Sequence, residues 1–155
     1  MPEPDAAVMN RVRALIDETG SERTQLLEVL HKVQAEFQHI PRAAAEAIEQ
    51  AMNVPVADTY GVVTFYDLLT ERPVGRSVLR ICEDVPCCLH GSEELAREAE
   101  QRLGPEGQPS ADGAVSWTRC ACLGLCDRAP AALYEEKPLA PLHHQDIASI
   151  GDRRA

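Results

Sequence analysis

The chain has 155 residues, a formal net charge of −10 at pH 7 and an apolar content of 45%. A chain of this length buries roughly 70% of its unfolded surface, so it can form a core without disulfide or metal staples. The acidic balance argues against nucleic acid or an anionic membrane as a partner, because both bind basic surfaces. No segment is apolar for long enough to cross a bilayer, and the first residues lack the basic-then-apolar pattern of a secretory signal. A cytoplasmic, reducing location is therefore expected.

Residues 1–72 predict a helical segment. Apolar residues recur at helical spacing between Val8 and Ile16, and Gly20 follows as a natural stop. Ser21 is expected to cap a second helix. Pro41 suits the first turn of a third helix, which Asn53 ends.

The stretch VPVADTYGVVTFYDLL, residues 54–69, predicts a short fourth helix that opens at Val56–Asp58. Its apolar residues Val62, Val63 and Phe65 favour plain core packing. No group in the first 70 residues indicates a catalytic or ligand-binding site.

Residues 73–155 predict a second domain, which begins after the change of composition at ERPVGRS. Strands are expected over 76–82 and 114–118, and a third through AALYEE with a turn at Lys137–Pro138. A helix capped by Ser92 is expected to end at Gly104, and a last short helix to run over 144–150. The order strand, helix, strand, strand, helix predicts an α+β fold, with a small sheet and helices packed on it.

All six cysteines fall into two short clusters. They are Cys82, Cys87 and Cys88 in ICEDVPCCLHGSEEL, and Cys120, Cys122 and Cys126 in RCACLGLCDRAP. Both clusters follow predicted strands, and in a reducing compartment clustered cysteines are more often metal ligands or redox groups than disulfides. Gly124 lies between two of them, at a position that is expected to need a conformation that glycine adopts cheaply.

Two close pairs of thiolates predict a four-thiolate site for zinc or for an iron–sulfur cluster. Structural zinc sites favour tight C-x2-C knuckles, whereas Cys82 and Cys87 are separated by four residues and Cys122 and Cys126 by three. The wider spacing favours a larger object with two irons. A thiol–disulfide enzyme fits less well, because no C-x-x-C is present. Spacing alone leaves open whether Cys87 or Cys88 is the ligand.

Other chemistry is weakly indicated. The histidines show no metal-ligand spacing, and neither a dinucleotide fingerprint, a phosphate-binding loop nor a nucleophile elbow occurs. A one-electron carrier without a substrate site of its own is what remains.

Three segments together resemble a known family. VPVADTYGVVTFYDLL, ICEDVPCCLHGSEEL and RCACLGLCDRAPAAL follow, in that order, the pattern of the small thioredoxin-like 2Fe–2S subunit of NADH-linked oxidoreductases. These are the 24-kDa subunit of respiratory complex I, the gamma subunit of NAD-dependent formate dehydrogenases and the small diaphorase subunit of bidirectional hydrogenases. The resemblance covers roughly residues 24–136 and implies an N-terminal helical segment followed by a thioredoxin-like 2Fe–2S ferredoxin domain.

The resemblance implies that Cys82, Cys87, Cys122 and Cys126 hold the two irons of one 2Fe–2S cluster. It also implies a partner subunit that binds FMN and NAD(H), further iron–sulfur subunits in the same complex, and no catalysis by this chain alone. Residues 1–72 are expected to dock the partner. The complex would lie in the cytoplasm or at the inner face of the membrane.

Two features depart from the family pattern. Ala121 stands where an acidic residue is expected, and the stretch 134–155 is expected to differ from the usual strand, turn, strand and closing helix. Two other functions are considered beside electron transfer within a complex. They are a zinc-stabilised binding module and a free-standing thioredoxin-like ferredoxin.

Overall fold

The protein is described by a computed structural model that covers residues 3–152. The chain forms two compact units, Met1–Pro73 and Val74–Ala155. The outermost ends of the two predicted domains, residues 1–2 and 153–155, lie outside the described residues. None of the helices within 3–152 combines the length and apolar character that crossing a membrane requires.

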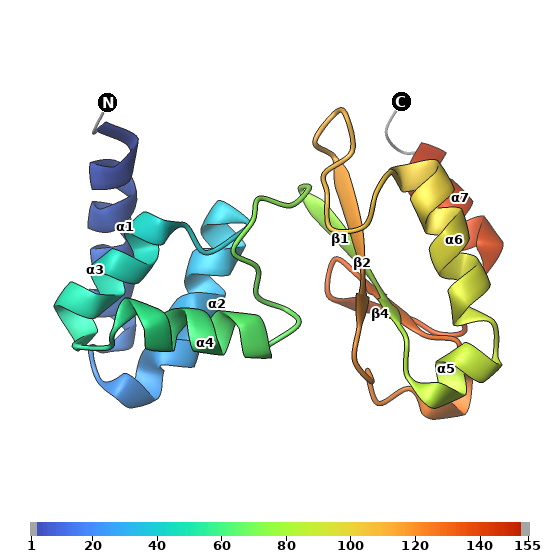
Figure 1. Cartoon of the computed structure of the whole chain (residues 1–155), viewed down its shortest axis with the longest axis horizontal. Helices are drawn as coiled ribbons and strands as arrows, with labels where there is room; N and C mark the ends of the chain where they lie inside the picture. Colours follow the sequence, from blue (N-terminus) through green and yellow to red (C-terminus); the bar gives the residue numbers. More distant parts are fainter. Residues whose placement is uncertain (1–2, 153–155) are drawn as a thin grey trace. The chain divides into compact units, whose positions relative to one another are not determined.

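Unit 1 consists of helices (Figure 1). They are α1 (Glu3–Thr19), a 3-10 turn η1 (Arg23–Gln25), α2 (Leu26–Phe37), α3 (Arg42–Met52) and α4 (Val56–Phe65). Helix α1 packs against α2 and α3, and α3 packs against α4. Their apolar faces meet in one core that includes Val12, Ile16, Leu30 and Ile48, all fully or almost fully buried.

The predicted ends of these helices are largely confirmed. Gly20 takes a left-handed φ of 119°, and its N–H donates to the carbonyl of Ile16 at 2.7 Å. Asn53 ends α3 in the left-handed conformation, with a φ of 54°. The prediction for Ser21 is wrong, because η1 intervenes and the residue that precedes α2 is Gln25, which makes no side-chain capping bond.

Helix α4 occupies the predicted place, but its packing differs from the prediction. Val63 is buried in the core of unit 1 and Val62 is partly buried. Phe65 is 77% exposed, so the expectation that it packs into the core is wrong. It lies at the end of α4, and its ring makes an edge-to-face contact with that of Tyr66 at 5.0 Å between centroids.

Unit 2 is a four-stranded sheet with helices. Its strands are β1 (Ser77–Cys82), β2 (Val115–Cys120), β3 (Ala132–Tyr134) and β4 (Lys137–Leu139), in the order β2-β1-β3-β4. Strand β1 runs parallel to β2, in a register that pairs Ser77 with Val115 and Cys82 with Cys120. Strand β3 runs antiparallel to β1 and β4. The α+β prediction is confirmed.

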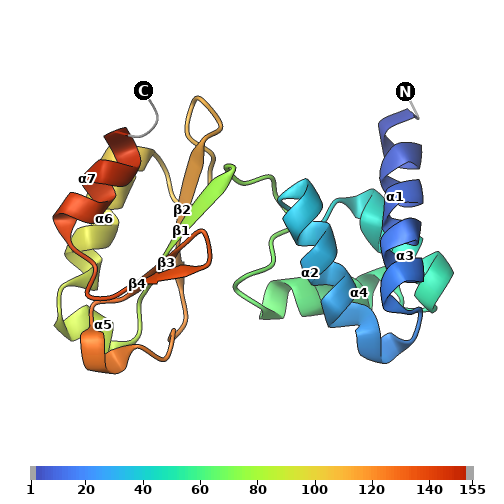
Figure 2. The same ribbon diagram turned by 180° about the vertical axis from the view of Figure 1, so that it is seen from behind.

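Two helices, α6 (Ser92–Leu103) and α7 (His144–Asp152), lie side by side on one face of this sheet (Figures 1 and 2). Between them and the sheet is a second core, built around Leu79, Ile81 and Trp117. The indole N–H of Trp117 donates to the carbonyl of Gly104 at 2.7 Å, which ties β2 to the end of α6. The core therefore fixes the ends of β1 and β2 against the helices.

Several details of unit 2 correct the prediction. A short helix, α5 (Val85–Leu89), was not expected, and Gly91 rather than Ser92 precedes α6. The last hairpin turns at Glu135 and Glu136, with φ of 50° and 62°, instead of at Lys137–Pro138. Residues 134–152 form the strand, turn, strand and closing helix from which they were expected to depart.

Candidate functional site

The cysteines gather at one edge of the sheet. Strands β1 and β2 are parallel and end at Cys82 and Cys120, so the segments that follow them emerge at the same edge. After β1 comes α5, which begins at Val85 because the carboxylate of Asp84 accepts the backbone N–H of Val85 at 2.7 Å. After β2 comes a loop that leads into the 3-10 turn η2 (Cys126–Arg128). The order of elements therefore brings both cysteine clusters together.

Four of the six thiols form two interacting pairs. The Sγ atoms of Cys122 and Cys126 lie 3.5 Å apart. Cys82 and Cys87 hydrogen-bond to each other, and each is only 2% exposed. The two pairs are near enough for the charges of Cys82 and Cys87 to interact with that of Cys126. One pair is thus buried beneath the sheet edge, whereas Cys122 and Cys126 are exposed.

The environment of these thiols disfavours isolated thiolates. Burial raises the pKa of Cys87 to about 11, and the neighbouring Cys82 and Cys126 act in the same direction. The pKa of Cys126 is raised by its hydrogen bond with Cys122 and by the charge of Asp84. Without a bound cation the site therefore holds its protons, and binding of a metal would displace them.

The other two cysteines occupy different positions. The thiol of Cys88 donates to the carbonyl of Glu83 at 3.0 Å and accepts the hydroxyl of Ser92 at 3.8 Å. Cys87 and Cys88 lie on a helix rather than in extended chain, so they point in directions about 100° apart. Cys120 is buried at the end of β2, beside Cys82 in the register.

The spacing of the thiols is close to what a metal needs. Two thiolates on one tetrahedral metal at about 2.3 Å lie about 3.8 Å from each other, close to the 3.5 Å between Cys122 and Cys126. Among residues 3–152, no set of three or more His, Cys, Asp or Glu side chains converges as the shell of a single metal ion would. The thiols come instead as two pairs, and this arrangement fits an object with two metals, each bound by two thiolates.

The loop between the exposed cysteines is shaped by glycine and leucines. Gly124 has a φ of 73°, as predicted, and this lets the chain turn sharply between Cys122 and Cys126. Leu123 and Leu125 are partly buried and pack against the small apolar cluster formed by Cys82, Cys87 and Ala131. The loop thus covers part of the site with apolar side chains.

Sequence reasoning missed an ionic network beside the site. The guanidinium of Arg119 contacts three carboxylates, those of Glu106 at 2.5 Å, Glu93 at 3.3 Å and Glu83 at 4.0 Å. It also lies over the ring of Trp117, 5.5 Å from the centroid. Only the pairing of strands reveals this network, because its acidic members are distant from Arg119 in the sequence.

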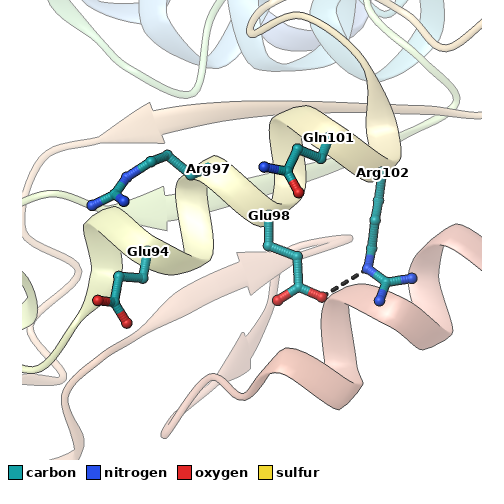
Figure 3. Close-up of a pocket in the computed structure, with 5 residues that line it drawn as sticks. All are labelled: Glu94, Arg97, Glu98, Gln101 and Arg102. Atoms are coloured by element: carbon teal, nitrogen blue, oxygen red, sulfur yellow. Dashed lines mark hydrogen bonds and ion pairs between the residues drawn. The ribbon is translucent and has the colours of Figure 1, made fainter.

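A separate hollow lies on α6, as Figure 3 shows. It is lined by Glu94, Arg97, Glu98, Gln101 and Arg102. Glu98 is bound by Arg102 at 2.7 Å and by His144 of α7. The lining has both signs of charge and no cysteine, so the hollow offers no continuation of the thiol site.

Comparison with known proteins identifies the family. The model of the thioredoxin-like [2Fe-2S] ferredoxin family matches residues 12–153. The chain belongs to this family. It is 33% identical to a subunit of the NADH-quinone oxidoreductase of Pseudomonas aeruginosa, over 83% of this chain and 78% of that one. It is also 33% identical to the subunit of the same name in Escherichia coli K12, over 84% of this chain and 80% of the relative.

Two hydrogenases are similar as well. The NADP-reducing hydrogenase subunit HndA of Solidesulfovibrio fructosivorans is 29% identical, over 88% of this chain and 79% of that one. The crystal structure of an air-oxidised NAD+-reducing [NiFe]-hydrogenase matches with a TM-score of 0.70 and 23% identity. The match covers 84% of this chain but only 22% of the hydrogenase chain. The family and the thioredoxin-like fold that the motifs predicted are thus confirmed.

Proposed function

We propose that this chain is an electron-transfer subunit of an NAD(H)-dependent oxidoreductase of the complex I, formate dehydrogenase or hydrogenase type. It would carry one 2Fe–2S cluster and exchange single electrons with the FMN of a partner subunit that also binds NAD(H). The main support is the arrangement of thiols in two pairs at one sheet edge, in a chain of the 2Fe–2S ferredoxin family. On this proposal the chain catalyses nothing by itself.

The four paired thiols are the proposed ligands. Cys82 and Cys87 would hold one iron, and Cys122 and Cys126 the other. The bound cluster would accept or release one electron at a time. The chain contributes an apolar cover, since Leu123, Leu125 and the buried first pair keep water from one side of the site. The exposed second pair leaves the other side open to an electron-transfer partner.

The two units would then have separate tasks. Residues 73–155 would carry the cluster, and residues 1–72 would dock the partner subunit. Support for docking comes from Phe65, Tyr66 and Leu68, three large apolar side chains exposed together at and after the end of α4. Such exposed patches are typical of contact surfaces. The complex, with further iron–sulfur subunits, would lie in the cytoplasm or at the inner face of the membrane.

Metal analysis of anaerobically purified protein tests this proposal. Two irons and two acid-labile sulfides per chain, with a visible spectrum that bleaches on reduction by dithionite, are expected. One zinc without sulfide or colour, in cells with an intact iron–sulfur assembly system, would instead identify a zinc-stabilised module.

Cysteine variants test the ligand set. Replacement of Cys82, Cys87, Cys122 or Cys126 by serine should lower the iron and sulfide content severely. Cys88→Ser is the matched control, because its thiol is bonded to Glu83 and Ser92 instead of to the paired thiols. A full cluster in a variant of a proposed ligand, or a lost cluster in the Cys88 variant, contradicts the assignment.

A further inference from the structure

The short helix α5 presents two large apolar side chains to solvent. Val85 is 66% exposed and Leu89 is 80% exposed. They are four positions apart, so both lie on the same side of the helix. Cys87 lies between them in sequence but is buried, facing Cys82. Helix α5 therefore has one side in the thiol site and another, apolar side open to solvent.

Acidic groups surround this apolar side. Glu83 and Asp127 are exposed on the two segments that flank α5, and Asp84 stands at its first turn. Their cationic neighbours only partly offset them. Arg128 pairs with Asp127 at 3.8 Å, and Arg119 is shared between Glu83 and two further glutamates. A bound cluster with four thiolates would add further negative charge at this edge.

Exposed apolar residues with a polar rim are the usual anatomy of a protein contact. Apolar residues at i and i+4 of one helix are also the typical anchors of a helix that docks into a groove. The rim is acidic, so it complements a surface with lysine or arginine and repels an acidic one. The position beside the exposed pair Cys122 and Cys126 favours a redox partner over an unrelated protein.

We infer that α5 is the electron-transfer contact of this chain, with Val85 and Leu89 as its anchors. They would seat in an apolar depression, edged by basic residues, on the flavin-bearing subunit. The inference rests on the proposed function and adds a surface of unit 2 to the docking role proposed for unit 1. Contact there excludes water from the open side of the site and brings the partner to the exposed thiol pair.

The test uses the intact complex, purified from its native host through a tag on this chain. In the variant Val85→Ala/Leu89→Ala, reduction of the cluster by NADH in stopped flow should slow at least 10-fold, or flavin should be lost from the complex. Iron, sulfide and bleaching by dithionite should stay as in the wild type. The matched control is Arg97→Ala/Gln101→Ala, also exposed and four positions apart, on α6 (Figure 3). It should behave as the wild type.

Wild-type rates and flavin content in the Val85→Ala/Leu89→Ala complex would overturn the inference. If the double variant loses its cluster, Leu89→Gln replaces it, because a side chain 80% exposed contributes little to folding. The rim has its own readout. Asp127→Asn should reduce the dependence of the NADH-driven rate on ionic strength, and an unchanged dependence counts against an acidic contact.

Failure of the proposed function would look different. A wild-type complex that contains a dithionite-reducible cluster but shows no reduction by NADH would contradict electron exchange with the flavin, and the inference would fall with it. If NADH reduces the wild-type cluster and the α5 variants equally fast, only the inference fails.

Discussion

Asp84 holds its carboxylate at the start of α5, where it accepts the backbone N–H of Val85 at 2.7 Å. Its negative charge reaches the thiol site, because it raises the pKa of Cys126. Glu83, one residue earlier, is more exposed and lies 4.0 Å from the guanidinium of Arg119. Of the two adjacent acids, Asp84 therefore has the stronger electrostatic influence on a bound cluster.

This difference predicts an order of reduction potentials. Asp84→Asn should raise the midpoint potential of the cluster, on the order of tens of millivolts, because a nearby negative charge disfavours the reduced state. Asparagine still caps α5, so the fold is retained. Glu83→Gln should shift the potential less. A spectroscopic redox titration of both variants measures this, and an equal or larger shift in the Glu83 variant contradicts the prediction.

The main elements could be predicted because their signals are local. Helical spacing with Gly20 and Asn53 at the ends, and the apolar strand before Cys82, carry enough residues to be recognised. Helix α5 has only five residues, too few for a periodic pattern, and so it was missed. The turn at Glu135 and Glu136 was misplaced because left-handed conformations are rare for glutamate.

The packing could not be predicted in the same way. Phe65 has an apolar side chain, but its exposure depends on where the end of α4 lies relative to the core of unit 1. The convergence of the two cysteine clusters depends on the parallel pairing of β1 and β2. The choice of Cys87 over Cys88 came from the family resemblance, and the helical geometry of α5 gives it a physical basis. The ligand set itself stays a prediction until the metal is analysed.

Glu98 predicts an acid-dependent loss of stability in unit 2. The pKa of Glu98 is lowered, first by its hydrogen bond with His144 and then by Arg102. A lowered pKa means that the ionised form stabilises the fold above the ordinary carboxyl pKa, and that this contribution is lost as the pH falls through the lower pKa of the folded state. Glu98→Gln should cost about 0.5–1 kcal/mol at pH 7, and little below that folded-state pKa.

Trp117, the only tryptophan in the sequence, lies in the core of unit 2, so its fluorescence during denaturation measures this cost directly. Glu100→Gln, on the exposed side of α6, is the control and should change stability little at any pH. A constant difference between wild type and the Glu98 variant from pH 7 to pH 3 would show that the carboxylate charge is not responsible.

Gly75 predicts a steric limit at the start of unit 2. Its N–H donates to the hydroxyl of Ser116 at 2.7 Å, and a Cβ added to it would lie only 2.4 Å from the carbonyl carbon of Val115. Gly75→Ala should therefore destabilise unit 2 by about 1–3 kcal/mol, as overpacking usually does. Gly61→Ala is the contrast, because a Cβ there meets no atom within 4 Å and α4 gains helix propensity. Equal stability of the Gly75 variant and the wild type, followed by Trp117 fluorescence, contradicts the steric argument.

Thr59 predicts a stabilising substitution in unit 1. Within the part of the chain that the structure describes, its hydroxyl is buried and has no hydrogen-bond partner. Burying a hydroxyl without a partner costs free energy, so Thr59→Val, of nearly the same shape, should stabilise α4 by about 1 kcal/mol. Thr64 is the matched control, because it is exposed and its hydroxyl donates to the carbonyl of Tyr60 at 2.9 Å.

Amide hydrogen exchange followed by mass spectrometry reports on this helix separately from unit 2. Peptides from residues 54–66 should exchange more slowly in Thr59→Val than in the wild type, whereas Thr64→Val should leave the rate nearly unchanged. Faster exchange in Thr59→Val would mean that the hydroxyl is satisfied, for example by a buried water, and that its removal breaks that bond.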